Sequence, residues 1–470
     1  LLQNDRNATK ETREFILNIE NNNPLWQINN DESDEFPVWS HDAVWSHDID
    51  ERSVEQLPKD AVDLVRWLGD NPKPNTDFPR YDWPDRCRKD FEQASKALKK
   101  LTEEGNWTPG RWAEALYAWS TDEHISDSWE FAAPLVSEMP DDDFIISIHA
   151  ISSWLVEVSK NFENYENHFF VIIDRIIESS SNKIDNSQDF SINKVINHPL
   201  GLVTWALLNW WFSTKPEDNQ SLPEKLTDRL EKLCNRDNQT LGKGAIICAG
   251  YLIPLYRVDQ EWTKTHLIKQ FYWTNKNASE MWGSFLHSPR IYPPLLNELK
   301  TSFLKVSKKF DNLDEIYREQ YISFSTNITL SEISVFNSKE LKEIFSNIDK
   351  KYLKNIAKTL YLNLLNVEGQ KAEYLKNRII PFIDNYWPKD TSKQTPEASE
   401  YFTELLAISG ESFNEIYGNI KHYLLPTNNL RFIRHLTDDI VQKYPKELLE
   451  LLCITIIRKP TLFTKYLTDL

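Results

Sequence analysis

The feature that most constrains this chain is a run of short amphipathic patterns between residues 198 and 308. The run begins with HPLGLVTWALLNWWF and ends with IYPPLLNELKTSFLKV, and its segments place apolar residues at helical spacing on one side. An apolar stripe on a helix has to be covered by another element. A succession of such stripes, joined by short polar turns, therefore predicts helical hairpins that stack on one another.

The scarcity of glycine indicates the same fold class, since only 11 of the 470 residues are glycine. Strand hairpins, phosphate-binding loops and β-bulges need residues with positive φ, which glycine adopts without strain. The sequence thus predicts an all-α fold, an irregular HEAT-like helical-hairpin array (an α-solenoid). We divide it into an acidic Trp-rich region at 1–150 with a long loop at 21–58, a hairpin array at 151–310 and a C-terminal array at 311–470.

Local signals predict individual helices within the central array. Pro199 follows His198 at the start of an apolar pattern, so we expect a helix over 199–213. Ser221 and Glu224 have the spacing of a capping box, which predicts a helix over 222–234. The nearly continuous apolar run at 243–256 predicts one buried helix, and we expect Asp259 to cap the next one.

Elsewhere the predictions concern longer or weaker patterns. We expect one helix over 83–101 and a helix after Asp141 whose buried stripe includes Phe144, Ile148, Ile151, Leu155 and Val158. Near residues 321–329 the pattern favours an extended segment. The tryptophans of the central array have the spacing of inter-helix packing residues: Trp205, Trp210, Trp211, Trp262, Trp273 and Trp282.

Charge divides the chain unevenly. Residues 1–150 contain 32 acidic and 15 basic residues, whereas residues 151–470 contain 39 of each. The acidic part also holds nine of the 17 tryptophans, a residue type that is enriched at binding hot spots. A solvated acidic face is one interpretation; the other is a surface for a basic partner protein, formed by Trp26, Trp39, Trp45, Trp107, Trp112, Trp119 and Trp129. Like charge repels phosphate, so the charge of this region disfavours nucleic acid as a partner.

A tandem repeat, VWSHDAVWSHDI, occupies residues 38–49. It places two His-Asp units in register, His41 with Asp42 and His47 with Asp48, which is compatible with a metal site or a proton-handling pair. Its tryptophans could instead anchor the loop on a helical surface, and we favour that interpretation. A metal-dependent enzyme with a site near His41 and His47 remains the alternative function.

The motifs of common catalytic sites are missing. Leu241-Gly242-Lys243-Gly244 lacks the spacing of a phosphate-binding loop, and no pair of the four cysteines has zinc-site spacing. We interpret Cys248 and Cys453 as packing residues. No apolar run is long enough to span a bilayer. These observations predict a cytoplasmic chain with no catalytic, cofactor or metal site of its own.

Two groups of segments carry a family resemblance. The first comprises 198–212, EWTKTHLIKQFYW (261–273) and MWGSFLHSPRIYPPLLNELKTSFL (281–304). The second comprises NRIIPFIDNYWPKD (377–390), FTELLAISGESFNEIYGNIKHYLLP (402–426) and YPKELLELLCITII (444–457). Together they resemble the long helical C-terminal regions of bacterial anti-phage defence proteins, in which a sirtuin-type NAD-consuming domain often precedes the helices.

The resemblance implies a non-catalytic infection sensor or regulatory scaffold. Such a region would bind a phage protein or another partner and regulate an effector domain outside this chain. The nucleotide-binding glycines and catalytic histidine of sirtuins have no counterpart here, so no catalytic residue is transferred. Because the chain starts at Leu1 inside a helical pattern, we expect it to be a piece of a longer protein. A purely architectural arm that forms homo-oligomers is a further alternative.

Overall fold

The computed structural model describes residues 54–55, 57–70, 80–81, 83–121, 123–160, 164, 166–181, 191–235, 241–331, 333–346, 348–367, 369–427 and 429–456. The chain divides into two compact units, the first of which is Leu1–Gln56 with Asn75–Asp82. Its described part consists of β1 (Val54–Glu55) and β2 (Arg80–Tyr81), which pair in parallel with Val54 opposite Arg80. The second unit, Leu57–Pro74 with Trp83–Leu470, contains the helices.

The predicted all-α fold class is confirmed, because the elements described in the second unit are helices apart from an isolated bridge between Thr427 and Ile456. The first helices are α2 (Ala61–Asp70), α3 (Trp83–Lys89), α4 (Phe91–Glu103), α5 (Pro109–Trp119), α6 (Ile125–Glu138), α7 (Asp141–Val158), α8 (Glu166–Ser181), α9 (Ile192–Ile196) and α10 (Pro199–Ser213). Next along the chain are α11 (Glu224–Cys234), α12 (Lys243–Gly250), α13 (Leu252–Val258), α14 (Gln260–His266), η2 (Ile268–Phe271), α15 (Ala278–His287), α16 (Pro293–Phe303), η3 (Val306–Asn312), α17 (Glu315–Leu330) and α18 (Ser338–Ser346). The last are η4 (Lys350–Tyr352), α19 (Leu353–Leu365), α20 (Lys371–Tyr374), the π-helix η5 (Leu375–Ile379), α21 (Ile380–Tyr386), η6 (Thr391–Lys393), α22 (Pro396–Ala407), η7 (Gly410–Ser412), α23 (Phe413–Ile420), η8 (Lys421–Tyr423), η9 (Arg431–His435), α24 (Asp438–Lys443) and α25 (Pro445–Thr455). Within the described residues, every helix is too short or too polar to cross a membrane.

Helix α10 shows why some boundaries were predictable. Pro199 occupies its first turn, where the missing N–H has no intrahelical partner to lose. The Nδ1 atom of His198 accepts a hydrogen bond from the backbone N–H of Leu200 at 3.1 Å and so caps the helix. The predicted range of 199–213 is confirmed.

Two predicted helices are each divided in the structure. The pattern at 83–101 contains a break at Asp90, whose side chain accepts from the N–H of Gln93 at 3.0 Å and starts α4 as a new helix. The run at 243–256 breaks at Tyr251 into α12 and α13. The burial expected of α12 is confirmed, and Asp259 caps α14 by accepting from the N–H of Trp262 at 2.9 Å.

The predicted extended segment at 321–329 is wrong, because these residues lie inside α17. β-Branched residues pack well in strands. Hydroxyl side chains disfavour helix interiors when they compete with the helix for backbone hydrogen bonds. Here two threonine hydroxyls bond within the helix instead. Thr326 Oγ1 donates to the carbonyl of Ile322 at 2.9 Å, and Thr329 Oγ1 donates to that of Ser325 at 2.8 Å.

The predicted capping box at Ser221 and Glu224 is also wrong. Helix α11 starts after Pro223 and has no side-chain cap. The neighbouring N–H of Leu222 donates instead to the carboxylate of Asp259 at 3.1 Å, in the loop before α14. A tertiary contact therefore replaces the local one.

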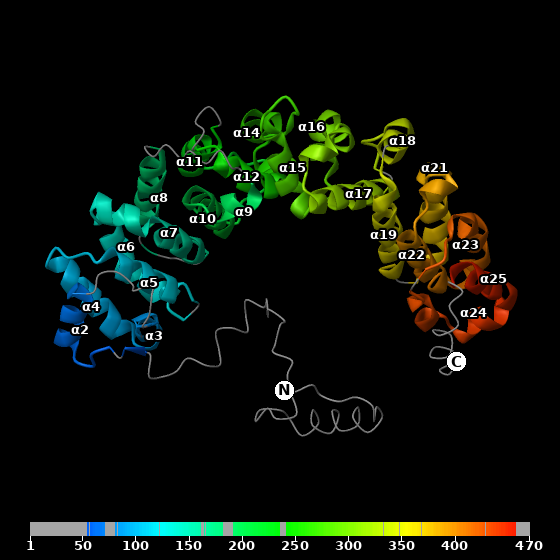
Figure 1. The fold of residues 1–470 in the computed structure, drawn as a ribbon. Coiled ribbons are helices and arrows are strands. Elements are labelled where there is room, and N and C mark those ends of the chain that lie inside the picture. Colours follow the sequence, from blue (N-terminus) through cyan, green and yellow to red (C-terminus); the bar gives the residue numbers. More distant parts are fainter. Residues whose placement is uncertain are drawn as a thin grey trace, which may run out of the picture. The chain divides into compact units, whose positions relative to one another are not determined.

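Helices that are not consecutive in the chain pack against each other: α5 with α7, α7 with α10, α17 with α19, and α19 with α22 (Figure 1). Asn363 Nδ2 donates to Asn327 Oδ1 at 2.8 Å near the end of α17 and α19, and Lys354 pairs with Glu319 at 3.0 Å near their start. The two helices therefore run parallel, with α18 between them in the chain. Stacked helical hairpins have this arrangement. The continuous HEAT-like array stays a prediction.

Tryptophan packing between the central helices is confirmed for Trp210, Trp211, Trp262 and Trp282, which are buried. Trp282 is fully enclosed, and its indole Nε1 donates to the carbonyl of Phe271 at 3.1 Å. Trp205 differs, with 37% of its surface exposed. Among the cysteines predicted to pack, Cys248 is buried, whereas Cys453 is exposed and that prediction is wrong.

Candidate functional site

The tryptophans predicted to bind a partner do not form one exposed surface. Trp112, Trp119 and Trp129 lie in the hydrophobic core, and a partner cannot reach them. The indole of Trp119 donates to the carbonyl of Cys87 at 3.1 Å, and Trp107 packs half-buried on Trp112 with ring centroids 6.0 Å apart. The remaining three predicted residues lie outside the described part of the chain: Trp26, Trp39 and Trp45.

The metal alternative also concerns residues outside the described part, since His41, Asp42, His47 and Asp48 all lie there. Among the residues that the structure describes, no three His, Cys, Asp or Glu side chains lie together in a group that could hold a metal ion. The site near His41 and His47 stays a prediction.

A different exposed surface occurs on the same acidic region, on α5 and α7. Ile146 is 62% exposed and Tyr117 is 47% exposed. Ile146 and His149 are three residues apart on α7, so they share a helix face. His149 Nε2 donates to the carbonyl of Asn197 at 2.9 Å, which leaves Nδ1 to accept from the hydroxyl of Tyr117 at 2.6 Å. We name Tyr117, Ile146 and His149 the α5–α7 surface.

Exposed carboxylates occur on α7, beside Ile146, and on the preceding helix α6. Asp142 is exposed one turn before Ile146 on the same face of α7, and α6 exposes Asp127 and Glu130. Within the described residues none of these three carboxylates forms an ion pair, whereas Asp141 pairs with Arg175 at 2.8 Å. The repulsion between neighbouring carboxylates is visible at Asp143, whose pKa is raised by burial and, to a smaller extent, by the charge of Asp142. An exposed apolar side chain, Ile146, and an unpaired carboxylate, Asp142, therefore lie one turn apart on α7.

The second candidate is a cavity of about 620 Å³ between the end of α17, the end of α19, the segment from α20 to η5, and residues 289–291. This volume is within the range of small-molecule sites. Phe324, Leu330 and Ile291 supply apolar walls, and Arg290 and Arg378 supply positive charge. Among the described residues that line it there is neither Asp nor Glu.

Polar side chains inside this cavity are already arranged by one another. Asn363 Nδ2 donates to Asn327 Oδ1 at 2.8 Å and to the carbonyl of Thr359 at 2.8 Å. The hydroxyl of Tyr374 donates to Asn363 Oδ1 at 3.4 Å, and burial raises the pKa of Tyr374. These contacts hold the side chains in place before any ligand arrives.

Arg378 is positioned by the π-helix η5. The N–H of Ile380 donates to the carbonyl of Leu375, five residues earlier, and not to the usual partner four residues earlier. Pro381 follows directly; it has no N–H, and its ring would crowd the carbonyl four residues before it. The wider π turn accommodates the proline inside an otherwise continuous helical segment, and turns of this kind are frequent at functional sites.

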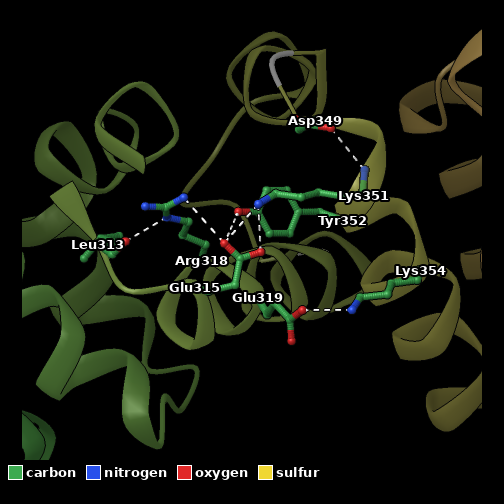
Figure 2. A network of polar contacts seen from close by, with 8 residues as sticks. All are labelled: Leu313, Glu315, Arg318, Glu319, Asp349, Lys351, Tyr352 and Lys354. Atoms are coloured by element: carbon green, nitrogen blue, oxygen red, sulfur yellow. Dashed lines mark hydrogen bonds and ion pairs between the residues drawn. The ribbon is translucent and has the colours of Figure 1, made fainter. Parts of the chain in front are cut away.

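A network of charged residues joins the start of α17 to η4 and α19, as Figure 2 shows. Glu315 accepts from Lys351 Nζ at 3.0 Å and from the hydroxyl of Tyr352 at 3.1 Å, with Arg318 at 3.5 Å. The hydrogen bond from Lys351 is the main cause that lowers the pKa of Glu315. Each of these charges has a partner within the network. We therefore interpret the network as structural contacts that hold α17 and α19 in register, and we do not interpret it as a ligand site.

The comparisons with known proteins add no identification: no family model matches the chain, and no curated protein matches it.

Proposed function

We propose that this chain is a non-catalytic helical sensor or scaffold region that binds a basic partner protein at the α5–α7 surface. The observation that supports the proposal is the exposure of Ile146 and Tyr117, with the unpaired carboxylate of Asp142 one turn from Ile146 on α7. The preceding helix α6 exposes two more unpaired carboxylates, Asp127 and Glu130. Large exposed apolar groups with a charged rim are typical of protein-binding surfaces. The negative charge would steer a basic partner and disfavour acidic ones.

The resemblance to anti-phage defence proteins extends this proposal. It suggests that the partner is a phage protein and that binding regulates an effector domain outside this chain. The two arguments concern different parts of the sequence. The charge and exposure argument rests on α5 to α7, and the resemblance rests on segments from 198 onward.

Site-specific photo-crosslinking tests the surface. The photoreactive residue p-benzoylphenylalanine replaces Ile146 in one sample and Leu449 in a matched control, since Leu449 is also highly exposed but lies on α25. We expect a cross-linked protein from position 146 in infected cells that is absent from position 449. The protein is then purified and its affinity for this chain measured by calorimetry.

The affinity measurements decide between the outcomes. We expect Ile146→Ser to weaken binding about tenfold, Leu449→Ser to leave it unchanged, and added salt to weaken it, because the charges are exposed. An acidic cross-linked partner, or a basic one whose affinity Ile146→Ser does not change, would show that the α5–α7 surface is not the site of recognition.

A further inference from the structure

We propose that Cys234 and Cys248 form a redox-sensitive pair, which hydrogen peroxide oxidises to a disulfide that locks α11 to α12. The pair lies on other helices than the partner surface on α5 and α7, and neither proposal depends on the other. Three observations support it: the contact between the two sulfur atoms, the close approach of the two helices, and the hydrogen bonds that fix both backbones.

The two thiols meet inside the protein. Cys234 is the last residue of α11, and its thiol donates to the Sγ atom of Cys248 on α12, with 3.9 Å between the sulfur atoms. Both cysteines are free, and their surfaces are 4% and 0% exposed. The S–S distance of a disulfide is about 2.05 Å, so the two sulfur atoms have to approach each other by only about 2 Å.

Gly244 allows the two helices to approach closely. A methyl group added at Gly244 would lie 2.7 Å from the Cβ atom and 2.7 Å from the carbonyl oxygen of Leu233, so α12 contacts the backbone of α11 directly. Leu233 precedes Cys234 in the chain. Gly244 and Cys248 are four residues apart and share the face of α12 that meets α11. Close backbones are what a disulfide requires, because the Cα atoms that it joins are usually about 4.4–6.8 Å apart.

Both backbones are fixed by hydrogen bonds from buried side chains of neighbouring helices. The Nε2 atom of Gln270, in η2, donates to the carbonyl of Cys234 at 3.2 Å. The hydroxyl of Ser284, in α15, donates to the carbonyl of Ile246 at 2.6 Å, two residues before Cys248 in α12. These contacts keep the two thiols opposed, so oxidation can join them without a large rearrangement.

Exposure and hydrogen bonding determine which thiol reacts first. Cys234 retains a small exposed surface, whereas Cys248 has none. The hydrogen bond with Cys234, and then burial, raise the pKa of Cys248 well above its ordinary value. Cys248 therefore stays protonated at neutral pH, and its thiol can donate to a thiolate at Cys234 and stabilise it. Hydrogen peroxide is much smaller than thiol-labelling reagents, so it can reach a thiol that they do not.

The peroxide takes up the two electrons that the pair loses. Cys234 gives up its proton, and its thiolate attacks one oxygen of the peroxide, which yields a sulfenic acid and a hydroxide that the proton converts to water. The sulfur of Cys248 then attacks the sulfur of Cys234, and the S–S bond forms. The sulfenic hydroxyl leaves with the proton of Cys248 as a second water.

Peroxide treatment of the folded whole chain tests the pair, in a Cys453→Ser background because the exposed Cys453 could link two molecules. Remaining thiols are then blocked with N-ethylmaleimide in denaturant, and tryptic peptides are analysed by mass spectrometry. We expect the Cys234 peptide to be joined to the Cys248 peptide with the loss of two hydrogen atoms, and dithiothreitol to separate them. Cys87, a buried free cysteine on α3, is the internal control and should be oxidised at least about tenfold more slowly.

Amide hydrogen exchange measures the locking of the helices. Exchange in α11 and α12 should slow by about tenfold on oxidation and recover with dithiothreitol. Cys248→Ser, the matched variant, should give neither the linked peptides nor the slower exchange. The proposal is overturned if both cysteines stay reduced until Cys87 is oxidised as well, because the link would then require unfolding. Linked peptides without slower exchange would refute the lock between α11 and α12.

Discussion

A test of the helix packing is the substitution Gly201→Ala in the first turn of α10. A methyl group added there would lie 1.9 Å from the carbonyl oxygen of Val195 and 2.9 Å from its carbon. Both atoms belong to the backbone at the end of α9, and the same carbonyl accepts from the N–H of His198 at 3.1 Å. No flexible side chain can move away, so α9 and α10 must separate.

The magnitude follows from two opposing terms. Overpacking of a rigid site costs about 1–3 kcal/mol, and occasionally more. Alanine is more favourable than glycine inside a helix by roughly 1 kcal/mol. Since a contact of 1.9 Å with backbone atoms puts the overpacking cost at the upper end of this range, we expect Gly201→Ala to lower the free energy of unfolding by about 2 kcal/mol. In Gly418→Ala, the matched control on α23, nothing lies within 4 Å of the added methyl. That variant should be more stable by about 0.5–1 kcal/mol.

Urea denaturation followed by tryptophan fluorescence measures the two differences. Stacked helices can open locally, so amide hydrogen exchange of α9 and α10 provides the regional measurement. Exchange there should accelerate in Gly201→Ala and remain unchanged in Gly418→Ala. If Gly201→Ala proves as stable as the parent, or gains stability as Gly418→Ala should, the close contact of α9 with α10 is refuted.

Three further predictions concern other regions. Native thiol labelling should modify Cys453 rapidly, while the buried thiols react only on unfolding: Cys87, Cys234 and Cys248. Arg175→Met should lower the free energy of unfolding by about 2–4 kcal/mol in urea, because Arg175 donates to three carbonyls at the end of α6, and Arg175→Lys should restore only part of this loss. Glu315→Gln should lower the melting temperature slightly at neutral pH, and this difference should shrink as the pH falls below 4.5. The lowered pKa of Glu315 stabilises the fold above its ordinary value of 4.5, and that contribution is lost as the pH falls through the folded-state value.

The sequence was most informative where a boundary depends on neighbouring residues. Pro199 and His198 define the start of α10 within one turn, and Asp259 caps α14 locally. It was least informative where a distant group replaces a local partner. The loop before α11 uses Asp259 instead of Ser221, and two threonine hydroxyls of α17 bond to carbonyls of their own helix, which composition does not reveal. Helix α6 was not predicted at all, since Pro134 interrupts its pattern.

The burial of the tryptophans could have been predicted from α5 alone. Trp112, Leu116 and Trp119 repeat at intervals of four and three residues, the spacing of a buried stripe, and all three are buried. The predicted stripe of α7 identifies its exposed residue by the same reasoning. Ile146 is apolar and lies off that stripe, and it is the residue that the structure exposes. An apolar residue outside the stripe is a better sign of a contact surface than the tryptophan count.

The cavity illustrates what a sequence pattern cannot supply. Arg290 and Arg378 are separated by almost 90 positions, and only the packing of α17 and α19 brings their segments to one cavity. The net charge would also have given the wrong expectation for this cavity. The chain carries a net charge of −17 and would be expected to repel anions. All of that excess lies in residues 1–150, and the part that forms the cavity is electrically balanced. The attraction of a site for an anion depends mainly on charges within a few ångströms, because salt screens charges that lie farther away than the Debye length. The net charge of the chain therefore does not decide which charges line this cavity, where the described charged residues are Arg290 and Arg378.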